Sequence, residues 1–119
     1  MKKNPFRGME PRELAVIHKL LEPTFPGRDQ LLQQLESAEV RTIDGDGSLE
    51  FSVKSDTSAN DIKHAVPTEA EYEDPDGVTV HVLLHVAGTK AKEVEFYRED
   101  GQQVQSWPTV TSMRVFAPE

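Results

Sequence analysis

The chain has 119 residues, of which 36% are hydrophobic and 29% charged, and its formal net charge is −8. This composition is typical of one globular domain, and the acidic balance argues against nucleic acid or anionic membrane as a partner, because both attract Lys and Arg. The absence of Cys excludes disulfides and thiolate chemistry. No apolar run reaches the length of a membrane span, so we expect a cytoplasmic protein with a single domain over residues 1–119.

Two helices are predicted in the first third of the chain. The segment EPRELAVIHKLLEP, residues 10–23, places Pro11 in a first turn, beside acidic residues that favour the positive end of a helix dipole. Its Leu and Ile residues recur at helical spacing. The segment PGRDQLLQQLESA, residues 26–38, predicts a second and shorter helix with its own leucine stripe.

A hairpin is predicted next, because VRTIDGDGSLEFSV, residues 40–53, has two short alternating runs around D-G-D-G. D-G-D-G-S-L-E also resembles the start of a calcium loop. A loop of the EF-hand type needs Gly at its sixth position and Glu at its twelfth, where this chain has Leu49 and Ser55. We therefore interpret D-G-D-G as a turn. The polar segment KSDTSANDIKH, residues 54–64, is predicted to be a mobile loop.

The rest of the chain predicts further strands separated by short turns: PTEAEYE, VTVHVLLHV, KEVEFYR, QQVQSW and TSMRVF. The expected fold class is therefore α+β, with two N-terminal helices packed on one face of an antiparallel β-sheet meander.

The segment H-V-L-L-H has the histidine spacing of a zinc-protease helix, at His81 and His85. The residue after the first histidine is Val82, where such a protease needs a Glu base. The surrounding residues are β-branched and alternate, which favours a strand. On a strand these histidines would lie about 13 Å apart, at ~3.3 Å per residue. Two imidazole nitrogens on one zinc lie about 3 Å apart, so the zinc-protease hypothesis fails.

The turns predict the strand register. EDPDGV suits a three-residue hairpin loop ending in a left-handed Gly, which pairs Glu71 with His81. REDGQ repeats this chemistry and would place Tyr97 opposite Gln103. Between them, a three-residue loop over residues 88–90 keeps apolar residues opposite one another and places His85 opposite Glu93.

This register gives the predicted sheet two unlike faces. The face under the helices is expected to carry Ala70, Tyr72, Val78, Val80, Val82, Leu84, Val86, Val94, Phe96 and Val104. The opposite face is expected to carry Glu69, Glu71, Glu73, His81, Leu83, His85, Glu93, Glu95, Tyr97, Gln103, Gln105 and Trp107.

Three hypotheses describe that second face. In the first, the face is a solvated surface whose Glu residues deter edge-to-edge association. In the second, it is a partner surface, since Tyr97 and Trp107 are of types enriched at binding hot spots. In the third, it is a metal or acid–base site. The residues for the third hypothesis are Glu71, His81, His85 and Glu93. A flat sheet offers no concave, water-excluding site, which counts against it.

The succession EAEYEDPDGVTVHVLLHV…KEVEFYREDG resembles a group of small uncharacterised bacterial proteins, marked by a D-x-D-G-V turn, an apolar strand and an E-x-E-F-Y-R-x-D-G hairpin. The resemblance is clearest over residues 67–101. It implies an α+β fold. Some similar small acidic proteins serve as immunity proteins against secreted toxins, which is an analogy, since fold does not determine function.

The leading hypothesis is a non-enzymatic, cytoplasmic binding module. Its most concrete version is an immunity protein that neutralises a basic toxin such as a nuclease. The partner-binding residues would be Glu69, Glu71, Glu73, His81, His85, Glu93, Glu95, Tyr97 and Trp107. We expect no catalytic residues, no cofactor, no metal, no nucleic acid and no membrane. The alternative is a small metal-dependent or acid–base enzyme that uses the His/Glu cluster. The oligomeric state stays open.

Overall fold

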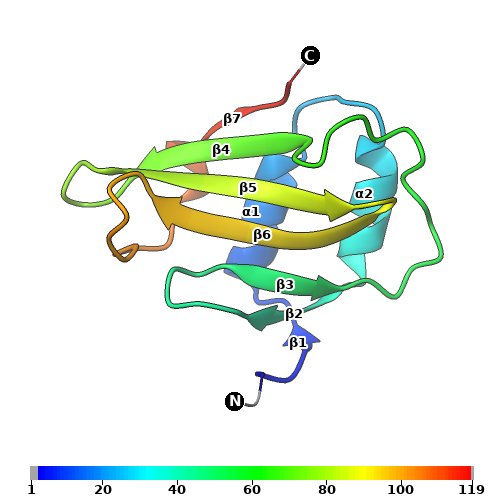
Figure 1. Cartoon of the computed structure of the whole chain (residues 1–119), viewed down its shortest axis with the longest axis horizontal. Helices are drawn as coiled ribbons and strands as arrows, with labels where there is room; N and C mark the ends of the chain where they lie inside the picture. The colour runs from blue at the N-terminus through cyan, green and yellow to red at the C-terminus, as the bar shows by residue number, and fades with distance from the viewer. Residues whose placement is uncertain (1–2, 119) are drawn as a thin grey trace.

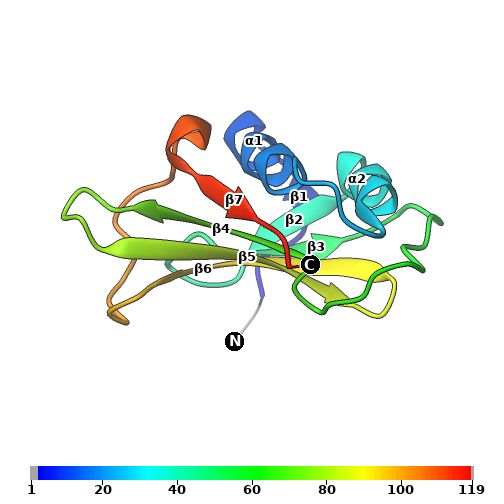
Figure 2. The same ribbon diagram turned by 90° about the horizontal axis from the view of Figure 1, so that it is seen from above.

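The computed structural model describes residues 3–118, which fold into an antiparallel sheet with both helices on one of its faces (Figures 1 and 2). The elements in chain order are β1 (Arg7–Gly8), α1 (Pro11–Leu20), α2 (Arg28–Glu36), β2 (Glu39–Thr42), β3 (Leu49–Ser52), β4 (Thr68–Glu73), β5 (Thr79–Ala87), β6 (Lys90–Arg98), the short 3-10 helix η1 (Val110–Ser112) and β7 (Arg114–Phe116). Within the described residues, neither helix has the length and apolar character needed to cross a bilayer.

The predicted α+β class, with two N-terminal helices and an antiparallel sheet, is confirmed. The strand order is β1-β2-β3-β6-β5-β4-β7. It departs from a simple meander in two places: β3 pairs with β6, and β7 returns to the far edge beside β4. The meander itself is limited to β4, β5 and β6.

Helix α1 begins where the sequence predicts, with Pro11 in its first turn. Glu10 and Glu13 form a reciprocal capping box, in which each side chain accepts a hydrogen bond from the other residue's backbone N–H. Glu13 is buried and also accepts two hydrogen bonds from Arg7, at 2.8 and 2.9 Å. This ion pair fastens the edge strand β1 to the helix layer.

The predicted register of β4, β5 and β6 is confirmed. Glu71 stands opposite His81, Tyr97 stands on the other side of His81, and His85 stands opposite Glu93. The first turn also forms as predicted: Gly77 has φ +88° and its N–H donates to the carbonyl of Asp74 at 2.8 Å. H-V-L-L-H therefore lies on a strand.

The turn between β5 and β6 differs from the prediction. Ala87 pairs with Lys90, so the loop contains two residues, Gly88 and Thr89, instead of three. A register shift beside Val86 adds the third residue within the strand as a bulge, which leaves Leu84 opposite Val94 as expected. The two arrangements have the same register beyond the bulge, so the hydrophobic pattern does not distinguish them.

The core lies between the sheet and the two helices, and it contains the apolar residues predicted for that face on β4, β5 and β6. Tyr72, Phe96 and Leu84 are among its largest buried side chains, each at most 1% exposed. They pack with helix residues such as Ile17 and Leu31. Full burial of one such side chain stabilises the fold by roughly 1.5–3 kcal/mol, so this layer provides most of the stability.

Strand β6 pairs with β3 over two residues only, Glu93 and Val94. On either side of these two residues, side chains take the place of a paired strand. The hydroxyl of Ser48 accepts from the N–H of Phe96 at 2.9 Å, and buried Gln34 of α2 accepts from the N–H of Ala91 at 2.9 Å. These bonds satisfy backbone groups that would otherwise be buried without a partner.

Residues 54–64 contain no helix or strand, as the sequence predicts, but they are anchored to the fold. The N–H of buried Ala59 donates to the carbonyl of Thr89 at 3.0 Å. Gln34 and Lys90 donate side-chain hydrogen bonds to the carbonyl of Thr57 at 2.9 and 2.8 Å. The mobility predicted for this loop stays a prediction.

The strand predicted over QQVQSW is wrong. The turn at Gly101 forms, with φ +79°, but the chain then leaves β6 and residues 102–107 join no sheet. Their backbone N–H groups bond to aspartate side chains of other turns. The N–H of Val104 donates to Asp46 at 2.8 Å, and the N–H groups of Gln105 and Ser106 donate to Asp74 at 2.9 and 3.1 Å.

Candidate functional site

The candidate site is the outer face, by which we mean the side of the sheet that points away from the helices. Figure 2 shows both helices and η1 on the opposite side. From the register, the outer face carries Glu69, Glu71 and Glu73 of β4, His81, Leu83 and His85 of β5, Glu93, Glu95 and Tyr97 of β6, and Arg114 and Phe116 of β7. Eight of the nine predicted site residues therefore lie together.

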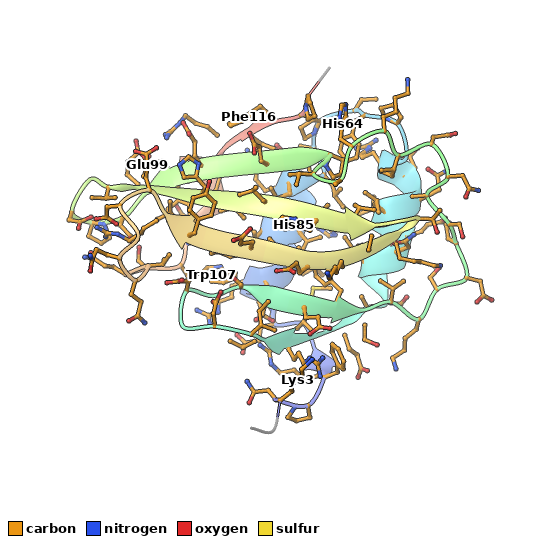
Figure 3. The ribbon with its side chains drawn as sticks, in the orientation of Figure 1. Lys3, His64, His85, Glu99, Trp107 and Phe116 are labelled. Carbon is orange, nitrogen blue, oxygen red and sulfur yellow. The ribbon has the colours of Figure 1, made fainter. Side chains whose placement is uncertain are left out.

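Each histidine of H-V-L-L-H bonds to a different carboxylate. His81 Nε2 lies 3.1 Å from Glu99 Oε1, and His85 Nε2 lies 2.8 Å from Glu95 Oε1. An ionised carboxylate only accepts, so Nε2 carries the proton in both rings. Neither partner is the residue directly opposite in the strand pairing; both lie further along the chain of β6 and its turn. His85 lies near the middle of the face and Glu99 near its turn end (Figure 3).

Strand β7 adds two residues that the sequence pattern did not assign to this face. Arg114 pairs with Glu71 at 3.2 Å and with Glu73 at 2.9 Å, and Phe116 stands opposite Glu69 with 44% of its surface exposed. The TSMRVF pattern does predict a strand. Its neighbour β4 is about 45 residues away in sequence, and nothing local identifies that partner.

Two of the face's carboxylates, Glu69 and Glu93, have no ion-pair partner within residues 3–118. Glu93 stands directly opposite Glu50 of β3, which is a like-charge pair. Glu50 is paired with Arg41 at 2.9 Å, whereas Glu93 has no ion-pair partner in the described part of the chain. Such an arrangement costs stability, because like charges facing one another across strands repel.

Trp107 does not lie on the outer face, and this prediction is wrong. Its ring packs on the buried ring of Phe96, with 4.9 Å between centroids, and its Nε1 donates to the carbonyl of Arg12 in α1 at 3.3 Å. These contacts lie on the helix side of the sheet. The expected positions of Gln103 and Gln105 fail for the same reason, since the segment 102–107 does not pair with β6.

The residues of D-x-D-G and R-x-D-G meet at one end of the sheet and form what we term the turn network: Asp74, Asp76, Arg98 and Asp100. The side chain of Arg98 is only 3% exposed and bonds to all three aspartates, at 3.1, 3.0 and 2.7 Å. Asp74 is fully buried and accepts the backbone hydrogen bonds of the segment 102–107 described above. The motif therefore builds the turns and holds the next segment in place.

In the turn network, hydrogen bonds favour the ionised form of two aspartate side chains. Hydrogen bonds from Arg98, and then from the backbone N–H of Gln102, lower the pKa of Asp100 to about 2. Hydrogen bonds from Arg98, and then from the backbone N–H of Val78, also lower the pKa of Asp76 below its usual range. These carboxylates are charged throughout the physiological range and are already bonded within the chain.

The outer face offers no ready metal site. Across residues 3–118, no three His, Asp or Glu side chains are placed to hold one metal ion together. A hollow of about 540 Å³ lies instead beside β2, where it is lined by residues that include Lys3, Arg41 and Ile43. Neither histidine of the face borders it.

Comparison with known proteins gives a family but no described activity. Neither the curated proteins nor the solved structures yielded a match to this chain. The model of one family, described as "Domain of unknown function (DUF6984)", matches residues 6–108. That range contains the two helices, the strands β1 to β6 and the turn network, and it ends before β7. The chain therefore belongs to the DUF6984 family.

Proposed function

We propose that this protein is a non-enzymatic, cytoplasmic binding module that receives a basic protein on its outer face. The most concrete version is a bacterial immunity protein that neutralises a basic toxin such as a nuclease. One observation carries the proposal: an acidic sheet face, covered by no element among residues 3–118, exposes Tyr97 at 41% and Phe116 at 44%.

Charge and aromatic exposure serve different parts of binding. The glutamates of the outer face would attract a basic partner and raise its encounter rate, an effect that weakens as salt increases. The aromatic side chains would lengthen the residence time, because buried aromatic anchors dominate binding energy at protein interfaces. Against a nuclease, the carboxylates would occupy positions that phosphates of the substrate otherwise take.

The second hypothesis, a metal-dependent or acid–base enzyme, has less support from the geometry. Of its four residues, Glu71 bonds to Arg114, and the histidines bond to Glu95 and Glu99. The outer face is a flat sheet, whereas acid–base catalysis needs a site that excludes water. No specific observation favours this hypothesis over a binding role.

The test uses the product of the adjacent gene, because immunity genes usually lie beside the genes of their toxins. We expect this product to arrest growth when expressed alone in a bacterial host, and we expect co-expression of the present protein to restore growth. The purified pair should form a complex whose association rate falls as salt rises. A neighbour without toxicity and without binding would contradict the immunity version.

Charge reversal identifies the face. Glu69→Lys combined with Glu93→Lys changes two carboxylates that hold no ion pair in residues 3–118, so the fold should persist while binding weakens. The matched control is Glu36→Lys combined with Asp61→Lys, which makes the same change in net charge. Both residues are exposed; Glu36 lies in α2, and Asp61 lies in the loop of residues 54–64, which contacts Gly27 just before α2. Equal loss of binding in both double variants would exclude the outer face as the specific surface.

A further inference from the structure

Tyr97 is the exposed member of a two-ring stack on the outer face. Its ring stacks on that of His81, with 4.9 Å between centroids and 21° between planes. His81 lies on β5, so it covers the face of the Tyr97 ring that is turned toward that strand. The other face of the ring is turned toward the β3 side of β6.

No strand residue stands beside Tyr97 on that second side. Strand β3 pairs with β6 only opposite Glu93 and Val94, and Tyr97 lies three residues beyond Val94. Figure 1 shows β3 and β6 diverging at this end of the sheet. This divergence explains why 41% of Tyr97 is exposed although it lies in a central strand.

The chain already stacks two of its own arginines on aromatic rings. The guanidinium carbon of Arg12 lies 5.0 Å from the ring centroid of Trp107, and that of Arg41 lies 4.2 Å from the ring centroid of Phe6. Among the cation–ring pairs of residues 3–118, none involves Tyr97. Tyr97 therefore offers the same kind of surface with no cation from the chain on it.

Two carboxylates flank Tyr97 along the chain. Glu95 lies two residues before Tyr97 on β6, about 7 Å away along the strand, and Glu99 is the first residue of the turn that follows β6. Each is held toward the outer face by its histidine, at 2.8 and 3.1 Å. A planar guanidinium that stacks on the ring can donate to a carboxylate at its edge at the same time, whereas a hydrated ammonium group cannot make both contacts as well.

We propose that Tyr97, with Glu95 and Glu99 beside it, is a subsite for an arginine side chain of a basic partner. This inference rests on the proposed function and adds the side chain that the outer face selects. His81 positions the site, since its ring supports Tyr97 from behind and its Nε2 bonds to Glu99.

The test uses three capped peptides of the sequence Gly-X-Gly-X-Gly, in which X is arginine, lysine or citrulline. Titrations at low ionic strength follow the ring signals of Tyr97 and His81 by NMR. We expect the arginine peptide to bind about two- to fivefold more tightly than the lysine peptide, and the uncharged citrulline peptide not to bind. The ring signals of both residues should move with the arginine peptide.

Variants separate the subsite from the charge of the face. Tyr97→Leu should abolish the preference for arginine over lysine, and Tyr97→Phe should keep it because the ring remains. Val110→Ala, at an exposed apolar residue of η1 on the helix side of the sheet, is the control and should also keep the preference. The amide spectrum of each variant reports whether the fold is retained.

Two outcomes would overturn the inference in different ways. Equal affinity for the arginine and lysine peptides, with shifts at Glu69 and Glu93 but not at Tyr97, would remove the subsite and leave the acidic binding surface intact. Failure of both basic peptides to shift any residue of the outer face would count against the subsite and against the proposed function together.

Discussion

The turn network and the outer face are both acidic, but their carboxylates bond to different partners. In the turn network, three aspartates surround one buried arginine and accept backbone N–H groups from the segment 102–107. On the outer face, two glutamates bond to histidines, and Glu69 and Glu93 hold no ion pair within residues 3–118. The turn network thus holds carboxylates that stabilise the fold, whereas Glu69 and Glu93 of the outer face are available to attract a partner.

The largest difference should appear between two arginines. We expect Arg98→Met to lower the Tm by about 15 °C, because it leaves buried Asp74 without its cation and releases both turns. Arg114→Met breaks an exposed ion pair on the outer face and should change the Tm by no more than about 2 °C. Calorimetry measures the Tm of both variants. A similar fall in Tm for the two would show that the ion pairs of the outer face stabilise the fold as much as those of the turn network.

Two aromatic residues provide the next contrast. Trp107→Ala should cost about 3 kcal/mol of unfolding free energy, because the ring packs on Phe96 and its N–H bonds to Arg12. Tyr97→Ala removes a ring that is 41% exposed and should cost less than about 1 kcal/mol. Urea unfolding gives both values. A costly Tyr97→Ala would mean that Tyr97 is a structural residue.

Acid should affect the turn network in a defined window. The pKa of Asp100 is lowered from 3.8 to about 2 by hydrogen bonds from Arg98 and from the backbone of Gln102. A carboxyl with a lowered folded-state pKa stabilises the fold above its unfolded-state pKa, and this contribution is lost as the pH falls through the folded-state value. Stability should therefore fall between pH 4 and pH 2. The fall should be shallower in Asp100→Asn, and parallel curves for the two proteins would contradict this role.

The smallest effect concerns Glu93, which faces Glu50 across the strand pair. Glu93→Gln removes this repulsion and should raise the unfolding free energy by about 0.3 kcal/mol. Glu95→Gln is the matched control, since that residue bonds to His85 and no gain is expected from its neutralisation. If Glu95→Gln raised the unfolding free energy and Glu93→Gln did not, repulsion between Glu93 and Glu50 would not destabilise the fold as proposed.

The local parts of the fold were predictable and the distant pairings were not. Asp74–Gly77 carries its turn chemistry within four residues, so the register of β4 and β5 follows from the sequence. Residues 102–107 alternate like a strand, but their N–H groups bond to Asp46 and Asp74, the first of which is 58 residues from Val104. A pattern of hydrophobic alternation carries no information about such side-chain acceptors.

For the candidate site, too, the sequence predicts the local features and not the distant pairings. Eight of its nine predicted residues lie on three strands joined by short turns, and these strands were placed correctly. Trp107 was misplaced because its position depended on the incorrect pairing of the segment 102–107. The pattern does not assign Arg114 and Phe116 to this face because β7 joins the sheet beside β4, with β5 and β4 between it and the preceding strand β6.

Amide hydrogen exchange at Val104, Gln105 and Ser106 measures directly whether aspartate side chains of the turns hold this segment in place. If turn carboxylates hold this segment, all three amides are protected in the native protein although they lie outside the sheet. Asp46→Ala should then remove protection at Val104 alone, while Asp74→Ala should remove it at Gln105 and Ser106. Unchanged protection in both variants would mean that the segment is held in another way, and would contradict the division between structural and available charge.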